Sequence, residues 1–356
     1  MYYPAKIFSK NPRLRLVYVA ALVSLVLLLL LAAAGCVGEA PTPVVPPDTP
    51  PPAQPAWQHI NTGVSFYGTS YGLVSGWKGT LLRTTDLGGT WYQTKVPISA
   101  DLNSVAILDA NTAIAVGAGG NILRSTDAGQ TWSQVDSHTG ETLNSVAAAG
   151  GGRAVAVGWR GTIIGTQDAG RTWTPLLASE NTSLNFQEVS FSQGGLGVAV
   201  SSSGDAYKSS DGVNWQPVTL PSQDQKLYSV DVLDNDDVYL AGNVDQDKVF
   251  VYGGTAVLLK TDNGGKTWTY GPRDLNANPL AIKYLDRRNV LAAGWDGAIL
   301  RTNDGGNSWT PMVSPTTEAI RAFAVADSNT VFAVGDGDTI LRSRDGGLSW
   351  QKLRGS

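Results

Sequence analysis

Tryptophan recurs along this chain at an almost constant interval. The marker positions are Trp91, Trp132, Trp173, Trp215, Trp268, Trp309 and Trp350, and the intervals between them are 41, 41, 42, 53, 41 and 41 residues. A period near 41 residues is typical of the four-stranded blades of a β-propeller. Helical repeats of similar length are excluded by the short apolar runs and Gly-rich turns between the markers. The seven markers therefore predict an all-β fold, a seven-bladed β-propeller of four-stranded blades over residues 57–356.

One repeat, residues 102–135, illustrates the predicted blade. Four strands are expected at residues 102–108, 112–116, 121–125 and 132–135, with turn-forming residues between them. A single blade covers only one side of each apolar strand, and the next blade must cover the other side. We therefore expect the closed ring, and not the single repeat, to be the folding unit.

A turn sequence, Ser/Thr-x-Asp-x-Gly-x-Thr/Ser-Trp, precedes the marker tryptophan in five repeats. The fourth copy is one residue shorter, and the fifth has asparagine in place of aspartate. The carboxylate position is occupied by Asp86, Asp127, Asp168, Asp211, Asn263, Asp304 and Asp345. A carboxylate there can accept hydrogen bonds from its own turn, while the glycine supplies a positive φ. Because a ring disperses these groups, we predict that they and the marker tryptophans are structural, not catalytic.

The composition narrows the classes of function. The formal net charge is −4, with no polycationic stretch beyond the first fifteen positions, which speaks against a nucleic-acid binder. Cys36 is the only cysteine, and His59 and His138 are the only histidines. Such a poor set of ligands excludes a zinc site and an internal disulfide, and it makes a Ser/His/Asp triad an unfavoured hypothesis. We expect no metal and no cofactor.

The N-terminus has the features of a targeting segment. Four basic residues precede an uncharged run over residues 17–34, and the small residues 33–35 stand directly before Cys36. This arrangement resembles a bacterial lipobox, although Ala33 stands where leucine is usual. We predict that residues 1–35 are a lipoprotein signal peptide and that Cys36 carries the lipid. The alternatives are an uncleaved signal anchor and a buried hydrophobic helix.

A proline-rich segment follows the predicted lipidation site. Residues 39–56 contain eight prolines, a composition typical of extended polyproline II conformations. At about 3.1 Å per residue, such a tether holds a domain up to ~50 Å from the bilayer. Residues 36–56 are thus predicted to be a lipidated tether, on the extracytoplasmic side of a bacterial membrane: the periplasm, the cell surface or a thylakoid lumen.

A longer pattern, Gly-Trp-x-Gly-x-Ile/Leu-Leu/Ile-x-Thr-x-Asp-x-Gly-x-x-Trp, occurs at residues 76–91, 158–173 and 294–309. It resembles the BNR, or Asp-box, repeat of sialidases and is similar to the photosystem II stability/assembly factor family. The resemblance extends from about Trp57 to the C-terminus. It implies an exported, lipid-anchored, non-enzymatic propeller, monomeric, that binds an integral membrane protein client. The basic patch with which that family contacts its client cannot be mapped residue by residue onto this sequence.

Asp-box sialidases and other glycosidases provide the enzymatic alternative. A sialidase-like site needs an arginine triad, a Tyr/Glu nucleophile pair and an aspartic acid. Glu188 is the one glutamate within a predicted inner strand; the others are Glu39, Glu141, Glu180 and Glu318. Three tyrosines are candidates to line the channel, Tyr67, Tyr228 and Tyr284, but no Tyr/Glu pair is evident. A glycan-binding protein and a purely structural surface lipoprotein are further alternatives.

Two sets of aromatic residues are candidates for partner binding. The loops between the second and third strands present Trp77-Lys78, Trp159-Arg160 and Trp295-Asp296 on the face opposite the Asp boxes, where tryptophans beside charges resemble interaction hot spots. The alternative is that these indoles pack between blades. The long fifth repeat adds an extension with Phe250 and Tyr252, which is either a contact arm or a tolerated loop insertion.

A basic residue stands three places before the box carboxylate position in six repeats: Arg83, Arg124, Lys208, Lys260, Arg301 and Arg342, with Gly165 interrupting the series. We favour pairing of these cations with an aspartate of the same or a neighbouring box. The alternative is a docking ring for an acidic partner segment. Ring closure is open at this stage, because residues 57–60 and 350–353 both resemble the strand that follows each marker, and both compete for the outer edge of the last blade.

Overall fold

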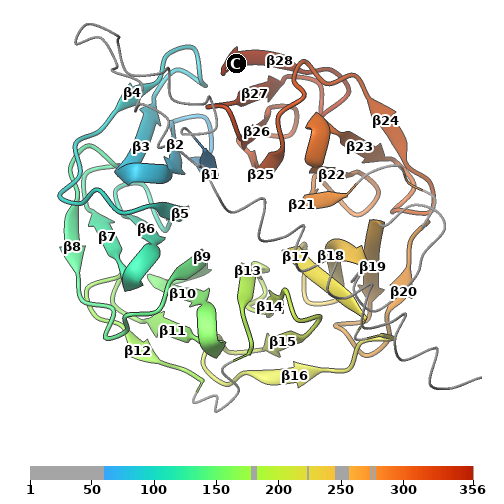
Figure 1. The fold of residues 1–356 in the computed structure, drawn as a ribbon, viewed down its shortest axis with the longest axis horizontal. Coiled ribbons are helices and arrows are strands. Elements are labelled where there is room, and N and C mark those ends of the chain that lie inside the picture. Colours follow the sequence, from blue (N-terminus) through green and yellow to red (C-terminus); the bar gives the residue numbers. More distant parts are fainter. Residues whose placement is uncertain are drawn as a thin grey trace, which may run out of the picture. The chain divides into compact units, whose positions relative to one another are not determined.

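The computed structural model describes residues 60–177, 183–222, 224–244, 256–272, 275 and 278–355. These residues form seven antiparallel sheets of four strands each, arranged as a ring around a central axis (Figure 1). The predicted seven-bladed propeller is therefore confirmed. The predicted signal segment, Cys36, the tether and the residues Phe250 and Tyr252 lie outside the described residues.

Each blade contains four consecutive strands in order from the axis outward. Blade 1 consists of β1 (Asn61–Tyr67), β2 (Tyr71–Gly76), β3 (Thr80–Thr84) and β4 (Tyr92–Gln93), and blade 2 of β5 (Leu102–Ile107), β6 (Ala113–Gly117), β7 (Ile122–Ser125) and β8 (Ser133–Val135). Blade 3 consists of β9 (Leu143–Gly150), β10 (Arg153–Gly158), β11 (Ile163–Thr166) and β12 (Thr174–Pro175), and blade 4 of β13 (Phe186–Phe191), β14 (Gly197–Ser201), β15 (Ala206–Ser209) and β16 (Gln216–Val218). Blade 5 consists of β17 (Gln225–Val232), β18 (Asp237–Val244), β19 (Ala256–Asp262) and β20 (Thr269–Tyr270). Blade 6 consists of β21 (Pro279–Tyr284), β22 (Val290–Gly294), β23 (Ile299–Thr302) and β24 (Thr310–Met312), and blade 7 of β25 (Ile320–Val325), β26 (Val331–Gly335), β27 (Ile340–Ser343) and β28 (Gln351–Arg354).

Every inner strand contains a register shift near its start. In β5, for example, the pairing with β6 skips Asn103, which lies between Leu102 and Ser104. A bulge of this kind turns two successive side chains to the same side of the strand. Asn103 and Ser104 both line the central channel as a result. The channel wall is therefore denser in polar side chains than a regular strand would make it.

The hydrophobic core lies between neighbouring blades. One cluster joins Ile114 and Val116 of blade 2 to Leu143, Val146 and Trp173 of blade 3. Four of the second strands are completely buried: every residue of β6, β14, β22 and β26 is inaccessible to solvent or nearly so. Each blade thus buries its apolar residues only against its neighbours, as expected for a ring that folds as one unit.

The C-terminal strand occupies the outer edge of the last blade. β28 pairs with β27, whereas residues 57–59 of the competing segment 57–60 lie outside the described residues. The seam between blades 7 and 1 is closed by packing: the rings of Phe66 and Phe332 stack at 4.2 Å between centroids. Gly88 lies against Phe332 with φ +75°, and a Cβ there would lie 2.6 Å from the Phe332 ring, so only glycine fits.

Three short 3₁₀ turns share the sequence Trp-x-Gly, η2 (Trp77–Gly79), η4 (Trp159–Gly161) and η5 (Trp295–Gly297), and η3 (Ala118–Gly120) has the same shape. Within residues 60–355, gaps excepted, no helix combines the length and the apolar character that crossing a membrane requires. Over the same residues, no three His, Cys, Asp or Glu side chains come together as metal ligands would.

Candidate partner-binding surface

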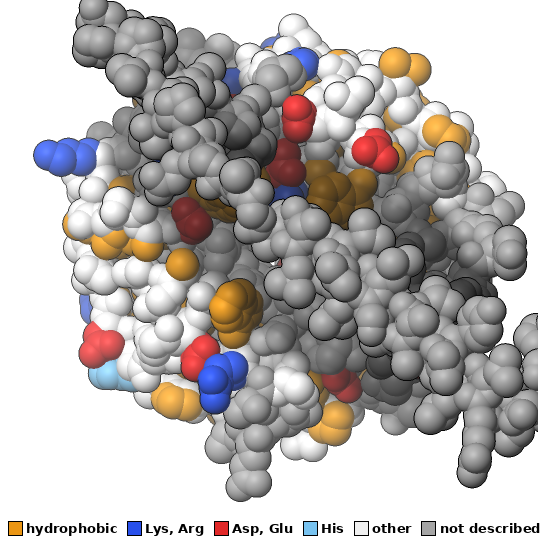
Figure 2. Space-filling model, viewed as in Figure 1, with side chains coloured by type: hydrophobic (Ala, Val, Ile, Leu, Met, Phe, Trp, Pro, Cys, Tyr) orange, Lys and Arg blue, Asp and Glu red, His pale blue; other side chains and the backbone are white. Residues whose placement is uncertain are grey.

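The ring has two faces that differ in their connections. On one face, here called the box face, lie the turns from the third to the fourth strand of each blade, which contain the Asp boxes. On the opposite face, here called the turn face, lie the turns from the second to the third strand and the connections between blades. Figure 2 shows hydrophobic side chains interspersed with acidic side chains on one face of the ring, with fewer basic ones.

The box carboxylates bind the backbone of their own turns. Asp86 Oδ1 accepts hydrogen bonds from the Thr84 hydroxyl at 2.8 Å and from the Thr90 N–H at 2.9 Å. These bonds, the Thr90 N–H first among them, lower the pKa of Asp86 to about 2. In blade 5 the amide oxygen of Asn263 accepts from the Thr267 N–H at 3.0 Å in the same way. A neutral amide can fill this position because its task is to hold the turn and not to carry charge.

The basic ring connects adjacent blades. Arg83 Nε donates to the Ala128 carbonyl at 2.8 Å, and Arg124 Nε donates to the Ala169 carbonyl at 2.6 Å. The same contact recurs from Lys208 to Gly264, Lys260 to Gly305, Arg301 to Gly346 and Arg342 to Leu87. The expected pairing with a box aspartate is thus wrong: in each case the acceptor is the backbone carbonyl that follows the box residue. The carboxylates are already occupied by their own turns, whereas these carbonyls point toward the neighbouring blade.

Arg153 completes the ring of contacts in blade 3, where Gly165 interrupts the basic series. Its guanidinium Nη1 donates to the Asp211 carbonyl of blade 4 at 3.2 Å. The cation comes from the start of β10 instead of from β11, so its sequence position follows a different rule. Sequence analysis missed this residue for that reason. Seven cation-to-carbonyl contacts, here called the latches, therefore run around the whole ring and include the seam.

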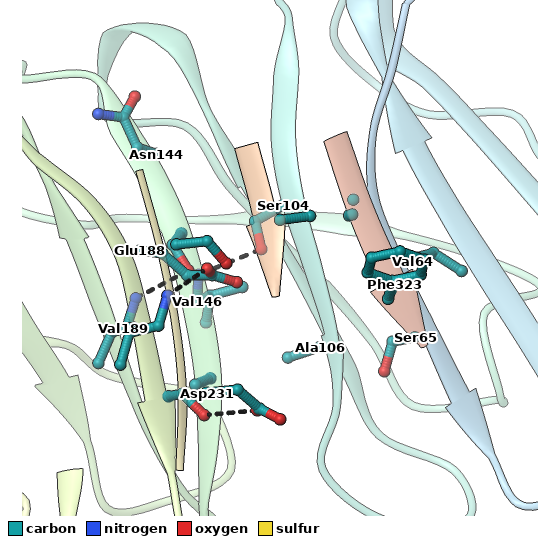
Figure 3. Close-up of a pocket in the computed structure, with 18 of the residues that line it drawn as sticks. Val64, Ser65, Ser104, Ala106, Asn144, Val146, Glu188, Val189, Asp231 and Phe323 are labelled. Atoms are coloured by element: carbon teal, nitrogen blue, oxygen red, sulfur yellow. Dashed lines mark hydrogen bonds between the residues drawn. The ribbon is translucent and has the colours of Figure 1, made fainter. Parts of the chain in front are cut away.

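The central channel has a volume of about 300 Å³ and is lined by the inner strands of all seven blades (Figure 3). Side chains of one inner strand accept hydrogen bonds from the backbone of the next. The Ser104 hydroxyl accepts from the Val146 N–H at 3.3 Å, and the Ser145 hydroxyl accepts from the Val189 N–H at 3.3 Å. Most polar groups in the channel wall thus contribute to holding blades together.

Two carboxylates replace serine in this pattern, Glu188 and Asp231. Glu188 Oε2 accepts the Val230 N–H at 2.9 Å, and Asp231 Oδ2 accepts the Tyr284 N–H at 2.8 Å. Enclosure within the narrow channel is the main cause that raises the pKa of Glu188 to about 7, and the charge of Asp231 adds to it. Hydrogen bonds from Ser229 and Val230 and the charge of Lys283 act in the opposite direction. Lys283 Nζ forms an ion pair with Asp231 at 2.7 Å.

The residues of a sialidase-like site do not come together in the described part of the channel. Tyr228 lines it, but Tyr284 is buried in the core between blades 5 and 6, and Tyr67 lies at the box-face end of β1. Arg321 is the one arginine in the lining, and its guanidinium is engaged by both carboxylate oxygens of Asp336. An arginine triad that could hold a substrate carboxylate is therefore absent from these residues.

The Trp-x-Gly turns project from the turn face. Trp159 and Trp295 are 49% and 46% exposed, and Trp77 is half-buried. The alternative that all three indoles pack between blades is thus wrong for Trp159 and Trp295. The residue after each tryptophan adopts a left-handed conformation, with φ 54° for Arg160 and 56° for Asp296. Blade 2 has Gly119 at this position, where glycine adopts the left-handed conformation without strain. In the other three turns a charged residue, Lys78, Arg160 or Asp296, adopts the same strained conformation and stands beside an indole.

Two arginines of the turn face form ion pairs within that face. Arg160 Nε lies 3.4 Å from Glu141 Oε1, and Arg321 stacks at 5.7 Å over the indole of Trp295 while binding Asp336. The backbone N–H of Lys78 donates to Asp101 at 2.8 Å. The structure thus brings Trp295 together with Arg321, a residue that the sequence analysis did not single out because it lies one blade further along the chain.

The family model described as "Photosynthesis system II assembly factor YCF48" matches residues 54–241 and 208–327. No curated protein sequence matches the chain. Among solved structures, one described as YCF48 bound to D1 peptide is 25% identical, covers 82% of this chain and 94% of its own, and has a TM-score of 0.66.

Two further structures share the fold. YCF48 from Cyanidioschyzon merolae is 22% identical and covers 82% of this chain and 97% of its own, with a TM-score of 0.64. The GH74 xyloglucanase from Xanthomonas campestris is 16% identical and covers 83% of this chain but 55% of its own, with a TM-score of 0.66. At these identities the likeness shows the fold alone.

The latches predict how the ring responds to loss of one cation. Replacing Arg124 with methionine removes a charge-assisted hydrogen bond and leaves the Ala169 carbonyl unpaired, so the free energy of unfolding should fall by about 1.5–3 kcal/mol. Arg124→Glu should cost more. The exposed Arg344, also on the box face, provides the control: Arg344→Glu should change stability by about 0.5 kcal/mol or less. Urea unfolding measures both; equal effects of the two reversals would contradict the latch assignment.

Glu188 predicts a pH-dependent stability. Between roughly pH 5 and pH 7 the folded state keeps the proton that the unfolded chain releases, so the free energy of unfolding falls as pH rises through this window, by up to about 3 kcal/mol. Glu188→Gln keeps an acceptor for the Val230 N–H but does not titrate. Its stability should therefore decline less over the same window. Identical pH profiles for the two proteins would show that Glu188 is ionised throughout.

Proposed function

Because the chain belongs to the photosynthesis system II assembly factor YCF48 family, we propose that it is a non-enzymatic binding platform for a segment of an integral membrane protein during assembly of the surrounding complex. The likeness to a YCF48 structure with a bound D1 peptide carries this proposal. The likeness spans nearly the whole propeller, so it concerns the complete ring and not a single blade. The client of this chain is expected to be a protein segment, as in that structure.

The turn face supports this proposal as the binding surface. It combines two half-exposed indoles with charged neighbours held in fixed backbone conformations, a combination typical of interaction hot spots. The box face is less suited to partner binding, because its ring of basic side chains is engaged in the latches between blades. Rigid presentation by a closed ring lowers the conformational entropy that binding would otherwise cost.

The same observations favour a role without catalysis. The channel carboxylates Glu188 and Asp231 each accept a backbone N–H of the neighbouring blade, a structural task that serine performs elsewhere. The likeness to a xyloglucanase concerns the fold, which hosts many activities. We expect no hydrolysis of fluorogenic sialosides or xylosides by the purified chain.

Export and lipid anchoring at Cys36 complete the proposal. The basic N-terminal residues, the uncharged run over residues 17–34 and the small residues before Cys36 support a lipoprotein signal. The prolines of residues 39–56 suit a spacer between the lipid and the propeller. Such a tether would let the turn face reach a client near the extracytoplasmic membrane surface.

Crosslinking in membranes tests the binding role. A photoreactive amino acid in place of Trp159 should crosslink the full-length chain to an integral membrane protein. The same amino acid in place of Tyr92, which is 63% exposed on the outer edge strand β4, provides the matched control and should give no such product. Equal crosslinking at both sites, or none to a membrane protein at Trp159, would contradict the proposal.

Metabolic labelling tests the anchor. With an alkyne fatty acid in the medium, the full-length chain should incorporate label and sediment with membranes, and Cys36→Ser should lose the label. We expect the variant to lose the label but to stay in the membrane through its uncleaved N-terminus, because the uncharged run over residues 17–34 still inserts. An unlabelled but membrane-bound unaltered chain would instead indicate a signal anchor.

A further inference from the structure

The charge of the turn face offers a way to define the partner more closely. The carboxylates at this end of the described blades are Asp101, Asp136, Glu141, Asp205, Asp224, Asp296, Glu318, Asp336 and Asp338. The basic side chains at the same end are Lys78, Lys95, Arg160, Lys226, Arg321 and Arg354. Carboxylates are thus in excess on the surface where the two exposed indoles lie.

Three of the six basic side chains of this face form ion pairs with its own carboxylates. Arg160 pairs with Glu141, Arg321 with Asp336, and Arg354 Nε with Asp338 at 2.5 Å. Asp136 and Asp296 are exposed, and neither has a Lys or Arg partner among the ion pairs of the described residues. The imidazole of His138 lies beside Asp136, with His138 Nδ1 3.2 Å from Asp136 Oδ2. The field that a partner meets is therefore negative.

Trp295 shows how an indole of this face holds a cation. Its indole already receives a guanidinium, that of Arg321, at 5.7 Å from the ring centroid. An indole beside carboxylates is a favourable receptor for a cation, because the ring face and the carboxylate attract it together. Trp159 has the same turn geometry and comparable exposure, with Glu141 of the same blade nearby.

The latch cations of the box face do not provide a binding site for an acidic segment. A ring of cations that could hold an acidic segment was the alternative for Arg83, Arg124 and the related residues. Each of them donates instead to a carbonyl of the next blade, which removes that ring as a free basic surface. The latch cations therefore do not form a docking site for an acidic segment.

We propose that the turn face binds a lysine- or arginine-containing segment of the partner protein, with cationic side chains placed over the exposed indoles and beside the excess carboxylates. This inference rests on the proposed function, because it specifies the chemistry of the segment that the platform holds. Association should be steered by charge and should weaken as salt screens the face.

The test uses the whole propeller with a short fluorescent peptide that alternates lysine with glycine and alanine, and a counterpart with glutamate at each lysine position. The lysine peptide should bind and the glutamate peptide should not. Trp159→Ala and Trp295→Ala should each weaken binding of the lysine peptide by roughly fivefold to tenfold. Asp136→Asn combined with Asp296→Asn should weaken it as well; asparagine tolerates the left-handed backbone of position 296. Tyr92→Ala should leave the affinity unchanged.

Several outcomes would overturn the inference: preference for the glutamate peptide, binding insensitive to salt, or an equal loss from Tyr92→Ala. Binding of a xyloglucan oligosaccharide in place of either peptide would overturn it in favour of a glycan. Circular dichroism of each variant separates loss of binding from loss of fold. If a membrane protein crosslinks at position 159 but the lysine peptide does not displace it, this inference is contradicted, whereas the proposed function is still supported. Absence of that crosslink would contradict the proposed function itself.

Discussion

Hydrogen bonds between the side chains of one blade and the backbone of the next fix how the blades of this molecule are arranged. They occur at two radii: around the channel, where serines and two carboxylates accept inner-strand N–H groups, and further out, where seven cations donate to carbonyls beside the Asp boxes. Apolar packing between blades supplies most of the burial, but it has no direction. The polar contacts set how each blade is placed against its neighbour, and among the described residues every blade is built from four consecutive strands.

This construction determines which surfaces remain for function. On the box face, the box carboxylates are occupied by their own turns, and the latch cations are occupied by the neighbouring blade. The channel carboxylates are likewise engaged with backbone N–H groups. The turn face differs, because it exposes two indoles and an excess of carboxylates on a rigid support. A binding role follows more naturally from this distribution than a catalytic one.

Much of the fold could be predicted from the sequence, because a repeat forces every blade to solve the same packing problem. The spacing of the tryptophans predicted seven blades, and the strands expected at residues 102–135 lie within one or two residues of β5 to β8. The contacts of the basic ring could not be predicted, because a sequence shows carboxylates but not the direction of backbone carbonyls. Arg153 was missed because its guanidinium substitutes for a side chain on a different strand. Tyr284 was placed at the channel, yet its side chain turns into the core, one position beyond the channel-lining Lys283. The prediction for Cys36 remains a prediction, because it concerns residues that the structure does not describe.

Hydrogen exchange on the intact propeller tests the central claim most directly. The N–H groups of Val146, Val189 and Ile282 belong to three different blades and donate across three different interblade boundaries. If the ring is one cooperative unit, these amides should exchange with a single free energy equal to that of global unfolding. Blade-specific free energies that differ by several kcal/mol would mean that blades open independently and that the contacts between them do not hold the ring as a unit.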